Sequence, residues 1–297
     1  MLRDCFSFLQ ENYYRGFSQN MTYFGIVSEY STFVHMKKLV IVGCGRLAGI
    51  VADAIISGLL NEYELVGVYS RTLSKAESIA EKIKLHGKTC VVCTTPDDLL
   101  ALKPDYLVES ASPAAMKELA LPTLKNGTSI VTLSIGALAD SSFYQEVIET
   151  AKANNTRVYI VSGATGGFDV LKTATLMGNA SATFFNEKGP NALKGTAIYD
   201  ETLQTKQSVV FSGNAAEAIN LFPTKVNVTV AASLASVGPE NMKVSIQSTP
   251  GFTGDTQRVE IKNDQIRAII DVYSSTADIA GWSVVNTLIN ITSPIVF

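Results

Sequence analysis

From residue 37 to 161 the chain alternates short apolar runs with segments of helical periodicity. The apolar runs read KLVIV, ELVGVY, TCVVC, DYLVES, TSIVTL and RVYIV, and the helical patterns span 46–60, 73–84, 113–125 and 141–153. Strands that alternate with helices pair in parallel, because each helix carries the chain back across one face of the sheet. We therefore predict an α/β domain over 37–161, built on a doubly wound parallel sheet.

The first loop of this domain carries a glycine pattern typical of dinucleotide binding. In GCGRLA, Gly43 permits a tight turn, Gly45 lets the backbone approach a pyrophosphate, and Ala48 supplies the small third position. The pattern predicts a Rossmann-type cofactor site that also includes Arg46 and Leu47, at the N-terminus of the next helix. The apolar stripe predicted for that helix comprises Leu47, Ile50, Val51, Ala54, Ile55 and Leu59.

The end of the second predicted strand indicates which dinucleotide binds. An acidic side chain there would accept hydrogen bonds from the ribose hydroxyls of NAD, but the chain reads GVYSRTLSK, without a carboxylate. Arg71 can pair with a 2′-phosphate, and Ser70 and Thr72 add hydroxyl donors. The pattern favours NADP, with NAD possible, over the alternative that Arg71 is a solvated surface charge.

The rest of the chain differs from this α/β domain in composition and in the number of helical patterns. After about residue 162 the sequence is rich in Thr and Val with fewer helical patterns, which predicts a second α+β domain over 162–274. The segment STADIAGWSVVNTLINI then predicts an apolar helix within 275–297. Residues 1–35 are dense in Phe and Tyr without helical or alternating period, so we expect an N-terminal extension that is not part of the fold.

The charge and hydropathy of the chain bear on whether it binds nucleic acid or a membrane. The formal charge of −3 and the isoelectric point near 5.5 predict no nucleic-acid partner, and no apolar run reaches the roughly 18 residues of a membrane span. We expect a cytoplasmic protein without a membrane partner or a bound metal. Cys90 and Cys93 in TCVVC have CxxC spacing, but alternate strand residues face opposite ways, so small apolar strand residues are the favoured interpretation.

Four longer motifs carry a resemblance to a known family. They are VESASPAAMKELA, SIGALAD, SGATGGFDVLKTA and GNAAEAINLFPTKVNV, in register over about residues 37–240. Together they are similar to the L-aspartate dehydrogenase family. The resemblance implies a nicotinamide domain, a substrate domain with an open mixed sheet, and a terminal helix that returns to the first domain. It also implies hydride transfer from an amine α to a carboxylate, giving an imine that hydrolyses to a keto acid and ammonia.

The same motifs map family positions onto this chain. The resemblance implies that Asn227, after the FP turn, holds the nicotinamide carboxamide or orients the substrate. Small residues after the fourth and fifth strands, and in the turn that opens the second domain, are expected on the nicotinamide side of the cleft. These residues are Ser110, Ala111, Ser112, Ser134, Gly136, Ser162, Gly163 and Ala164.

The chain departs from the family in a later strand. Family members carry a proton-transfer histidine in the pattern Asn, any residue, His, any residue, Ile, whereas GDTQRVEI places Gln257 there. Glutamine does not titrate, and a positioned acid or base contributes roughly 10²- to 10⁴-fold in rate. The segment SSTADIAGWS also lacks the family's cation for a substrate carboxylate. Lys172 and Asp169 are candidate proton carriers, and a water held by Gln257 and Asn227 is the other option.

Two functions from different classes follow from these residues. The first is an NADP-dependent oxidoreductase acting on a small amino or keto acid, with Asn227, Gln257, Lys172 and Asp169 as catalytic candidates. The second is a non-catalytic NADP-binding sensor or scaffold that has lost the histidine. In either case we expect a homodimer formed through the sheet of the second domain.

Overall fold

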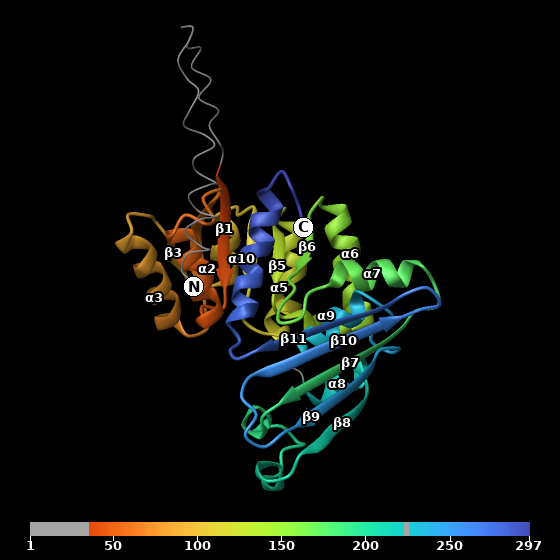
Figure 1. Ribbon diagram of the computed structural model, residues 1–297. Helices are drawn as coiled ribbons and strands as arrows, with labels where there is room; N and C mark the ends of the chain where they lie inside the picture. Colours follow the sequence, from red (N-terminus) through yellow and green to blue (C-terminus); the bar gives the residue numbers. More distant parts are fainter. Residues whose placement is uncertain (1–35, 223–225) are drawn as a thin grey trace, which may run out of the picture. The chain divides into compact units, whose positions relative to one another are not determined.

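A computed structural model describes residues 36–222 and 226–297 of the chain. The extension predicted for residues 1–35 lies outside the described residues. Within the described part the chain forms two sheets, which Figure 1 shows with their helices. No helix of that part is long and apolar enough to cross a bilayer.

In the described residues, six parallel strands form the first sheet, in the order β3-β2-β1-β4-β5-β6. The order reverses between β1 and β4, so their carboxyl ends open a crevice at the topological switch point. This arrangement confirms the predicted doubly wound parallel sheet. The strands are β1 (Lys37–Val42), β2 (Tyr63–Tyr69), β3 (Val91–Cys93), β4 (Tyr106–Glu109), β5 (Ser129–Thr132) and β6 (Val158–Ile160).

The helices around this sheet differ from the predicted ranges at two places. The sequence pattern does not predict α4 (Pro96–Ala101), which a capping box begins: the Thr95 hydroxyl accepts from the Asp98 N–H, and the Asp98 carboxylate accepts from the Thr95 N–H. The first helix, α2 (Arg46–Ile56), ends before the predicted residue 60, because Gly58 has a φ of +80°. Leu59 therefore leaves the predicted buried stripe and is 52% exposed. The remaining helices are α3 (Leu73–Leu85), α5 (Pro113–Lys125), the 3₁₀ helix η1 (Ile135–Ala139) and α6 (Ser141–Ala153).

The first sheet is buried on both faces. Leu39 and Ile41 of β1 point into a core with α2 and α3, whereas Val40 and Val42 point into a second core with α5 and α6. Cys90 packs against the first core and Cys93 lies in the second. The two thiols are thus on opposite faces of the sheet, although Cys93 ends β3 and Cys90 immediately precedes that strand.

A mixed sheet forms the second half of the described chain, as predicted. Its strand order is β11-β10-β7-β9-β8, with β7 and β9 parallel and the other neighbours antiparallel. Alternate residues of these strands form an inner face that packs on α7, α8 and α9. The elements are α7 (Phe168–Leu176), β7 (Ser181–Lys188), η2 (Pro190–Leu193), η3 (Glu201–Gln204), β8 (Ser208–Asn214), α8 (Ala215–Leu221), α9 (Asn227–Leu234), β9 (Lys243–Ser248), β10 (Asp255–Lys262) and β11 (Arg267–Ser274).

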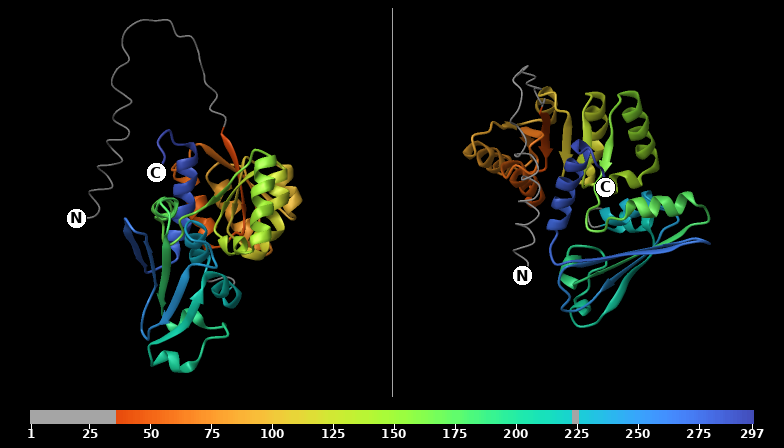
Figure 2. Two further views of the ribbon diagram at one scale, coloured as in Figure 1. Left: turned by 90° about the vertical axis from the view of Figure 1, so that its right-hand side faces the viewer. Right: turned by 45° about the horizontal axis from the view of Figure 1, so that its top comes forward.

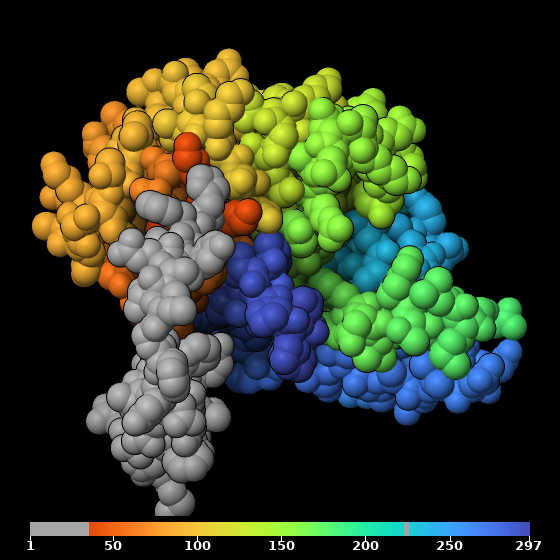
Figure 3. Space-filling view, turned by 90° about the horizontal axis from the view of Figure 1, so that it is seen from above, coloured from red at the N-terminus to blue at the C-terminus, as the bar shows by residue number. Residues whose placement is uncertain are grey.

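The last helix, α10 (Asp278–Thr292), lies against the first sheet's helices (Figures 1 and 2). A Cβ on Gly281 would lie 2.6 Å from Ile50 Cδ1 and 3.3 Å from the Leu47 carbonyl oxygen, so α10 and α2 approach closely at this glycine. The buried hydroxyl of Tyr63 donates to the Leu288 carbonyl oxygen at 2.8 Å. In Figure 3 the C-terminal segment (blue) accordingly lies beside the first strands and helices (orange).

Candidate cofactor and substrate site

A pocket of about 280 Å³ opens where β1, β2 and β4 end. Doubly wound sheets bind nucleotides at such a reversal of strand order. The pocket unites the glycine loop, the end of β2 and the loop after β4. The predicted cofactor residues that line it are Gly43, Gly45, Ser70, Arg71, Thr72, Ser110, Ala111 and Ser112.

The absence of a side chain has a different role at each of the two glycines of the loop. Gly43 has a φ of +89°, and a Cβ there would lie 2.6 Å from the Ala111 Cα, so the neighbouring loop excludes a side chain. The Ser110 hydroxyl stabilises this approach by donating to the Gly43 carbonyl oxygen at 2.7 Å. A Cβ on Gly45, by contrast, would meet no atom within 4 Å. Gly45 therefore leaves open space beside the start of α2, where a pyrophosphate fits.

The three residues that follow Gly45 do not line the pocket. Arg46 pairs with Asp278 in the first turn of α10, with 2.8 Å between Nη2 and Oδ1. Leu47 places its carbonyl oxygen against α10 at Gly281, and Ala48 is buried in the core. What these residues offer a phosphate is the set of backbone N–H groups in the first turn of α2, which have no partner within the helix.

The end of β2 presents hydroxyl and cationic side chains to the pocket. Arg71 is exposed, and the Thr72 N–H donates to Ser70 Oγ at 3.3 Å. Lys75, in the first turn of α3, also lines the pocket. Lys75 was not among the predicted cofactor residues, although its spacing of four residues from Arg71 in SRTLSK indicates the same side of the helix start.

Glu109, the last residue of β4, connects two loops of the site and was also missed. Its fully buried carboxylate accepts hydrogen bonds from the N–H groups of Ala111 and Ser112 at 2.9 and 3.0 Å. It also accepts from the hydroxyls of Thr132 and Ser134 at 2.9 and 3.0 Å. Burial raises the pKa of this carboxyl, while the four donors act in the opposite direction. The loops after β4 and β5 are thus held by one acidic side chain.

Asn227 joins the loop after β5 to the start of α9. The Gly136 N–H donates to Asn227 Oδ1 at 2.8 Å, and a Cβ on Gly136 would lie 2.9 Å from that oxygen. The next residue, Val228, packs 3.4 Å from where a Cβ of Gly163 would lie. The start of α9 therefore brings Asn227 together with the predicted loop after β5 and with the turn at 162–164.

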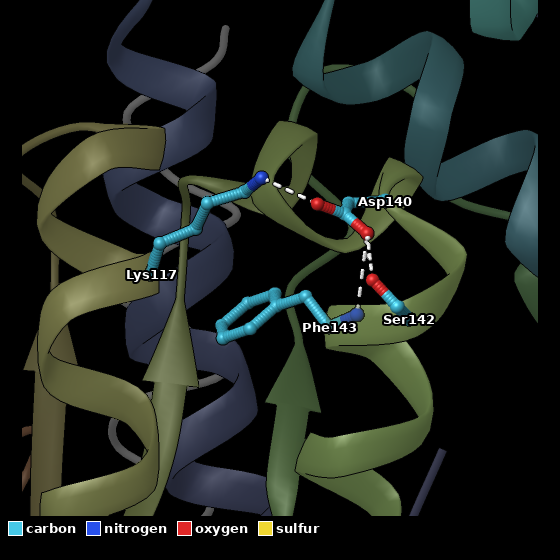
Figure 4. Close-up of polar contacts among 4 residues, drawn as sticks. All are labelled: Lys117, Asp140, Ser142 and Phe143. Atoms are coloured by element: carbon cyan, nitrogen blue, oxygen red, sulfur yellow. Dashed lines mark hydrogen bonds and ion pairs between the residues drawn. The ribbon is translucent and has the colours of Figure 1, made fainter.

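An ion pair supports the same loop from its far end (Figure 4). Lys117 of α5 donates to Asp140 Oδ2 at 2.8 Å, and Asp140 begins α6 by accepting from Ser142 Oγ at 2.7 Å and the Phe143 N–H at 3.2 Å. These contacts lower the pKa of the Asp140 carboxyl, with the Lys117 hydrogen bond as the largest cause. The loop that carries Ser134 and Gly136 is thus fixed at both ends.

The inner face of the second sheet ends in polar side chains. Strand register places Gln257 of β10 beside Asn186 of β7, and both are buried. Two pairs along, Asp255 lies beside Lys188, with 3.3 Å between Oδ1 and Nζ. The Asn186 amide donates to the Thr256 carbonyl oxygen at 2.9 Å and to Asp255 Oδ1 at 3.4 Å. Gln257 therefore shares the inner face with Lys188, a cation that the sequence analysis missed.

The other two candidate proton carriers lie on α7. Asp169 and Lys172 are exposed there, whereas Leu171 and Ala174 of the same helix are buried in the core. Among the described residues, no hydrogen bond or ion pair joins either residue to Gln257 or Asn227. The structure thus brings Asn227 to the predicted loops and turns Asp169 and Lys172 toward solvent.

The chain matches known proteins over both sheets. Residues 43–161 match the family model described as homoserine dehydrogenase, NAD binding domain, and 169–291 match that described as aspartate dehydrogenase, C-terminal. The L-aspartate dehydrogenase of Methanococcus maripaludis is 30% identical, and that of Methanosarcina acetivorans 32%, each over 88% of this chain and 98% of its own length. This chain belongs to the L-aspartate dehydrogenase family. The crystal structure of aspartate dehydrogenase from Thermotoga maritima, 26% identical, matches with a TM-score of 0.69 over 89% of this chain and 100% of its own.

Members of the L-aspartate dehydrogenase family share the nucleotide domain and the mixed sheet seen here, and this chain is an oxidoreductase with a nicotinamide cofactor. The open space at Gly45 and the polar end of β2 fit the phosphate groups of such a cofactor. In the register of the family motif, Gln257 stands where the resemblance places the proton-transfer histidine.

Proposed function

We propose that this chain transfers hydride between NADP(H) and a small amino or keto acid. In the oxidative direction an amino acid, oxidised cofactor and water would yield a keto acid, ammonia, reduced cofactor and a proton. The cofactor supplies the hydride acceptor when bound. The rest of the proposal concerns how residues of this chain hold the two reactants.

The observation that carries the cofactor assignment is the charge at the end of β2. Arg71 and Lys75 are both cationic and line the pocket, and no carboxylate occurs in the sequence from 70 to 75. The acidic side chain of the lining, Glu118, belongs to α5 rather than to β2. Arginine pairs with phosphate through two parallel hydrogen bonds, which an adenosine ribose without a 2′-phosphate would leave unused.

Residues on the other side of the cleft would position the nicotinamide and the substrate. The proposed nicotinamide contacts are the small residues of the loop after β5 and of the turn at 162–164, with Asn227 between them. Because Gly136 already occupies Asn227 Oδ1, the amide nitrogen is the atom we assign to the cofactor or substrate. Gln257 would hold a water for proton transfer, since it does not titrate itself.

Cofactor preference is tested by replacing Arg71. Arg71→Asp should weaken NADPH binding by about tenfold to a hundredfold, the range expected for a hydrogen bond to a charged group, and should favour NADH relatively. Calorimetry with both dinucleotides measures the change, and Arg71→Lys, which keeps the charge, should lose less. Unchanged NADPH affinity in Arg71→Asp would contradict the assignment.

The reaction is tested by following NADPH oxidation with oxaloacetate, pyruvate and other keto acids in the presence of ammonia. Turnover with any of them supports the proposal. NADPH binding without turnover on the whole panel would instead favour the non-catalytic alternative, which the absence of a titrating group at Gln257 supports.

A further inference from the structure

Lys188 is a buried lysine whose ion-pair partner is itself partly exposed to water. Its side chain is 7% exposed, and lysine is rarely buried to this extent unless it is paired. Within residues 36–222 and 226–297 its one ionic partner is Asp255, at 3.3 Å, and that side chain is 40% exposed. An ammonium group has three donors. Lys188 therefore has donors to spare beside a carboxylate that is itself partly in water.

Ser248 adds an unsatisfied hydroxyl beside Lys188. Register pairs Ser248 of β9 with Lys188 of β7, and both side chains are buried on the inner face. The Ser248 hydroxyl is fully buried and makes no hydrogen bond to any described residue. A buried polar atom without a partner destabilises the folded state. A spare donor on Lys188 and an orphaned hydroxyl on Ser248 together indicate a ligand with acceptor oxygens.

The position of Lys188 relates it to the site of reaction. Lys188 is a diagonal neighbour of Gln257 across β7 and β10, and such neighbours have Cα atoms roughly 7–8 Å apart. The same end of the sheet leads to the nucleotide loop, because Ser274 pairs with Asp255 and the chain reaches Asp278 four residues later. Four residues span at most about 14 Å. Since Asp278 contacts Arg46, the polar end of the sheet lies toward the cofactor loop.

We infer that Lys188, with the Ser248 hydroxyl beside it, binds a carboxylate of the substrate. The inference rests on the proposed function and names the group that the segment SSTADIAGWS fails to provide. Asp255 is the counterion of Lys188 in the absence of substrate. The substrate carboxylate either displaces Asp255 or binds Lys188 together with it. The ligand class is a small organic acid whose carboxylate reaches Lys188 while its reacting carbon lies near Gln257.

The test is equilibrium binding of malonate and succinate to the NADPH-loaded protein, measured by calorimetry. The wild type should bind at least one of them, and malonamide, which has the same shape without charge, should bind much more weakly. Lys188→Met should lose about tenfold to a hundredfold in dicarboxylate affinity and keep its NADPH affinity. Lys262→Met is the matched control, because Lys262 is exposed at the end of the neighbouring strand β10.

Two more variants keep the inference testable if Lys188→Met fails to fold. Ser248→Ala removes the unsatisfied hydroxyl, so the Tm should hold or rise while dicarboxylate affinity falls severalfold. Asp255→Asn removes the competing carboxylate, so dicarboxylates should bind more tightly. A purely structural pair would behave otherwise: Asp255→Asn would lower the Tm and leave dicarboxylate binding unchanged.

Either of two binding results would overturn the inference: no dicarboxylate binding by the wild type, or equal binding by wild type and folded Lys188→Met. Because the binding assay does not require turnover, dicarboxylate binding that depends on Lys188 can be observed even if no keto acid is reduced. In the separate NADPH-oxidation assay, turnover with unaltered KM in Lys188→Met would preserve the proposed function and remove Lys188 from the substrate site.

Discussion

The nucleotide end of the cleft and its reaction end are built from different kinds of residue. At the nucleotide end, Gly43 and Gly45 act through their lack of a side chain, and Arg71 follows them at the end of the next strand. At the reaction end, Gln257 and Lys188 are brought together by the register of two antiparallel strands far apart in sequence. Backbone geometry restricts Gly43 to glycine, and the space needed by a pyrophosphate favours glycine at Gly45, whereas any side chain of suitable size can occupy the reaction-end positions. Residues at the reaction end can therefore change while the cofactor pocket is retained.

The largest expected effect separates the two glycines of the nucleotide loop. Gly43→Ala should destabilise the fold by about 1–3 kcal/mol from backbone strain and a similar amount from overpacking against Ala111. Gly45→Ala should leave the Tm unchanged, because its Cβ meets no protein atom, and should weaken NADPH binding at least tenfold, as roughly expected when a group fills the pyrophosphate position. Thermal unfolding and calorimetry measure both. A Gly45→Ala protein that binds NADPH with unchanged affinity would contradict the role assigned to Gly45 in leaving space for the pyrophosphate.

Glu109→Gln tests the carboxylate that connects the two loops. The amide would place donors opposite the N–H groups of Ala111 and Ser112, so we expect a loss of about 1–3 kcal/mol in unfolding free energy and weaker NADPH binding. The measurement is urea unfolding with and without NADPH.

The pH profile of Glu109→Gln sharpens this prediction. Burial raises the pKa of Glu109 in the folded state, so the folded protein binds more protons than the unfolded chain above the ordinary glutamate pKa. The contribution of Glu109 to stability should therefore fall as pH rises from about 4.5 toward the folded-state pKa. Glu109→Gln should remove that slope, and an identical slope in both proteins would assign it to other groups.

Gln257→His addresses the reaction end directly. Histidine has an unperturbed pKa near 6.5, so the variant should gain amine dehydrogenase activity by at least about tenfold, with a pH dependence that the parent lacks. Gln247→His is the matched control, because Gln247 hydrogen bonds to Glu187 and Thr249 and lies on the other face of the sheet. Equal gains in both variants would show that the position of the histidine does not matter.

Asp140→Ala should have the smallest effect. It removes the N-cap of α6 and the partner of Lys117, so the Tm should fall by less than in Glu109→Gln. Because the folded-state pKa of Asp140 is lowered, its contribution is present above the ordinary aspartate pKa and is lost as pH falls. The Tm difference between wild type and variant should therefore shrink in acid. A difference that grows there would contradict this assignment.

Quaternary structure remains a prediction. The homodimer expected through the second sheet requires a surface on its outer face, where Val209, Ile269 and Tyr273 are exposed. Light scattering gives the mass in solution, and Tyr273→Glu should reduce a dimer to a monomer if that face carries the contact.

The first sheet was predictable because its signals are local. Each of its strands is a short apolar run, and Gly43 and Gly45 stand in a fixed spacing beside one of them. The end of α2 was predictable only with knowledge of the Gly58 φ, and α4 only by reading Thr95 and Asp98 as a capping box.

The reaction end was harder to predict because its residues meet through strand pairing. The family motif indicated Gln257, yet nothing near it in sequence points to Lys188. A signal did exist in SATFFNEK, where alternation puts Lys188 on the same face as Ala182 and Phe184. A lysine in phase with buried apolar residues indicates a buried cation. The Glu109 signal is similar, since an acidic residue ends an otherwise apolar strand.

The contact of α10 with α2 has a consequence for how the chain folds during synthesis. Val284, Val285 and Leu288 complete a core that begins with β1, and the buried Tyr63 hydroxyl finds its acceptor only at Leu288. A nascent chain that has emerged as far as β11 therefore contains every strand of the first sheet. One core of that sheet is still incomplete, and the Tyr63 hydroxyl still lacks its acceptor. The nucleotide domain, although it begins first, can reach its final stability only after the second sheet has been made.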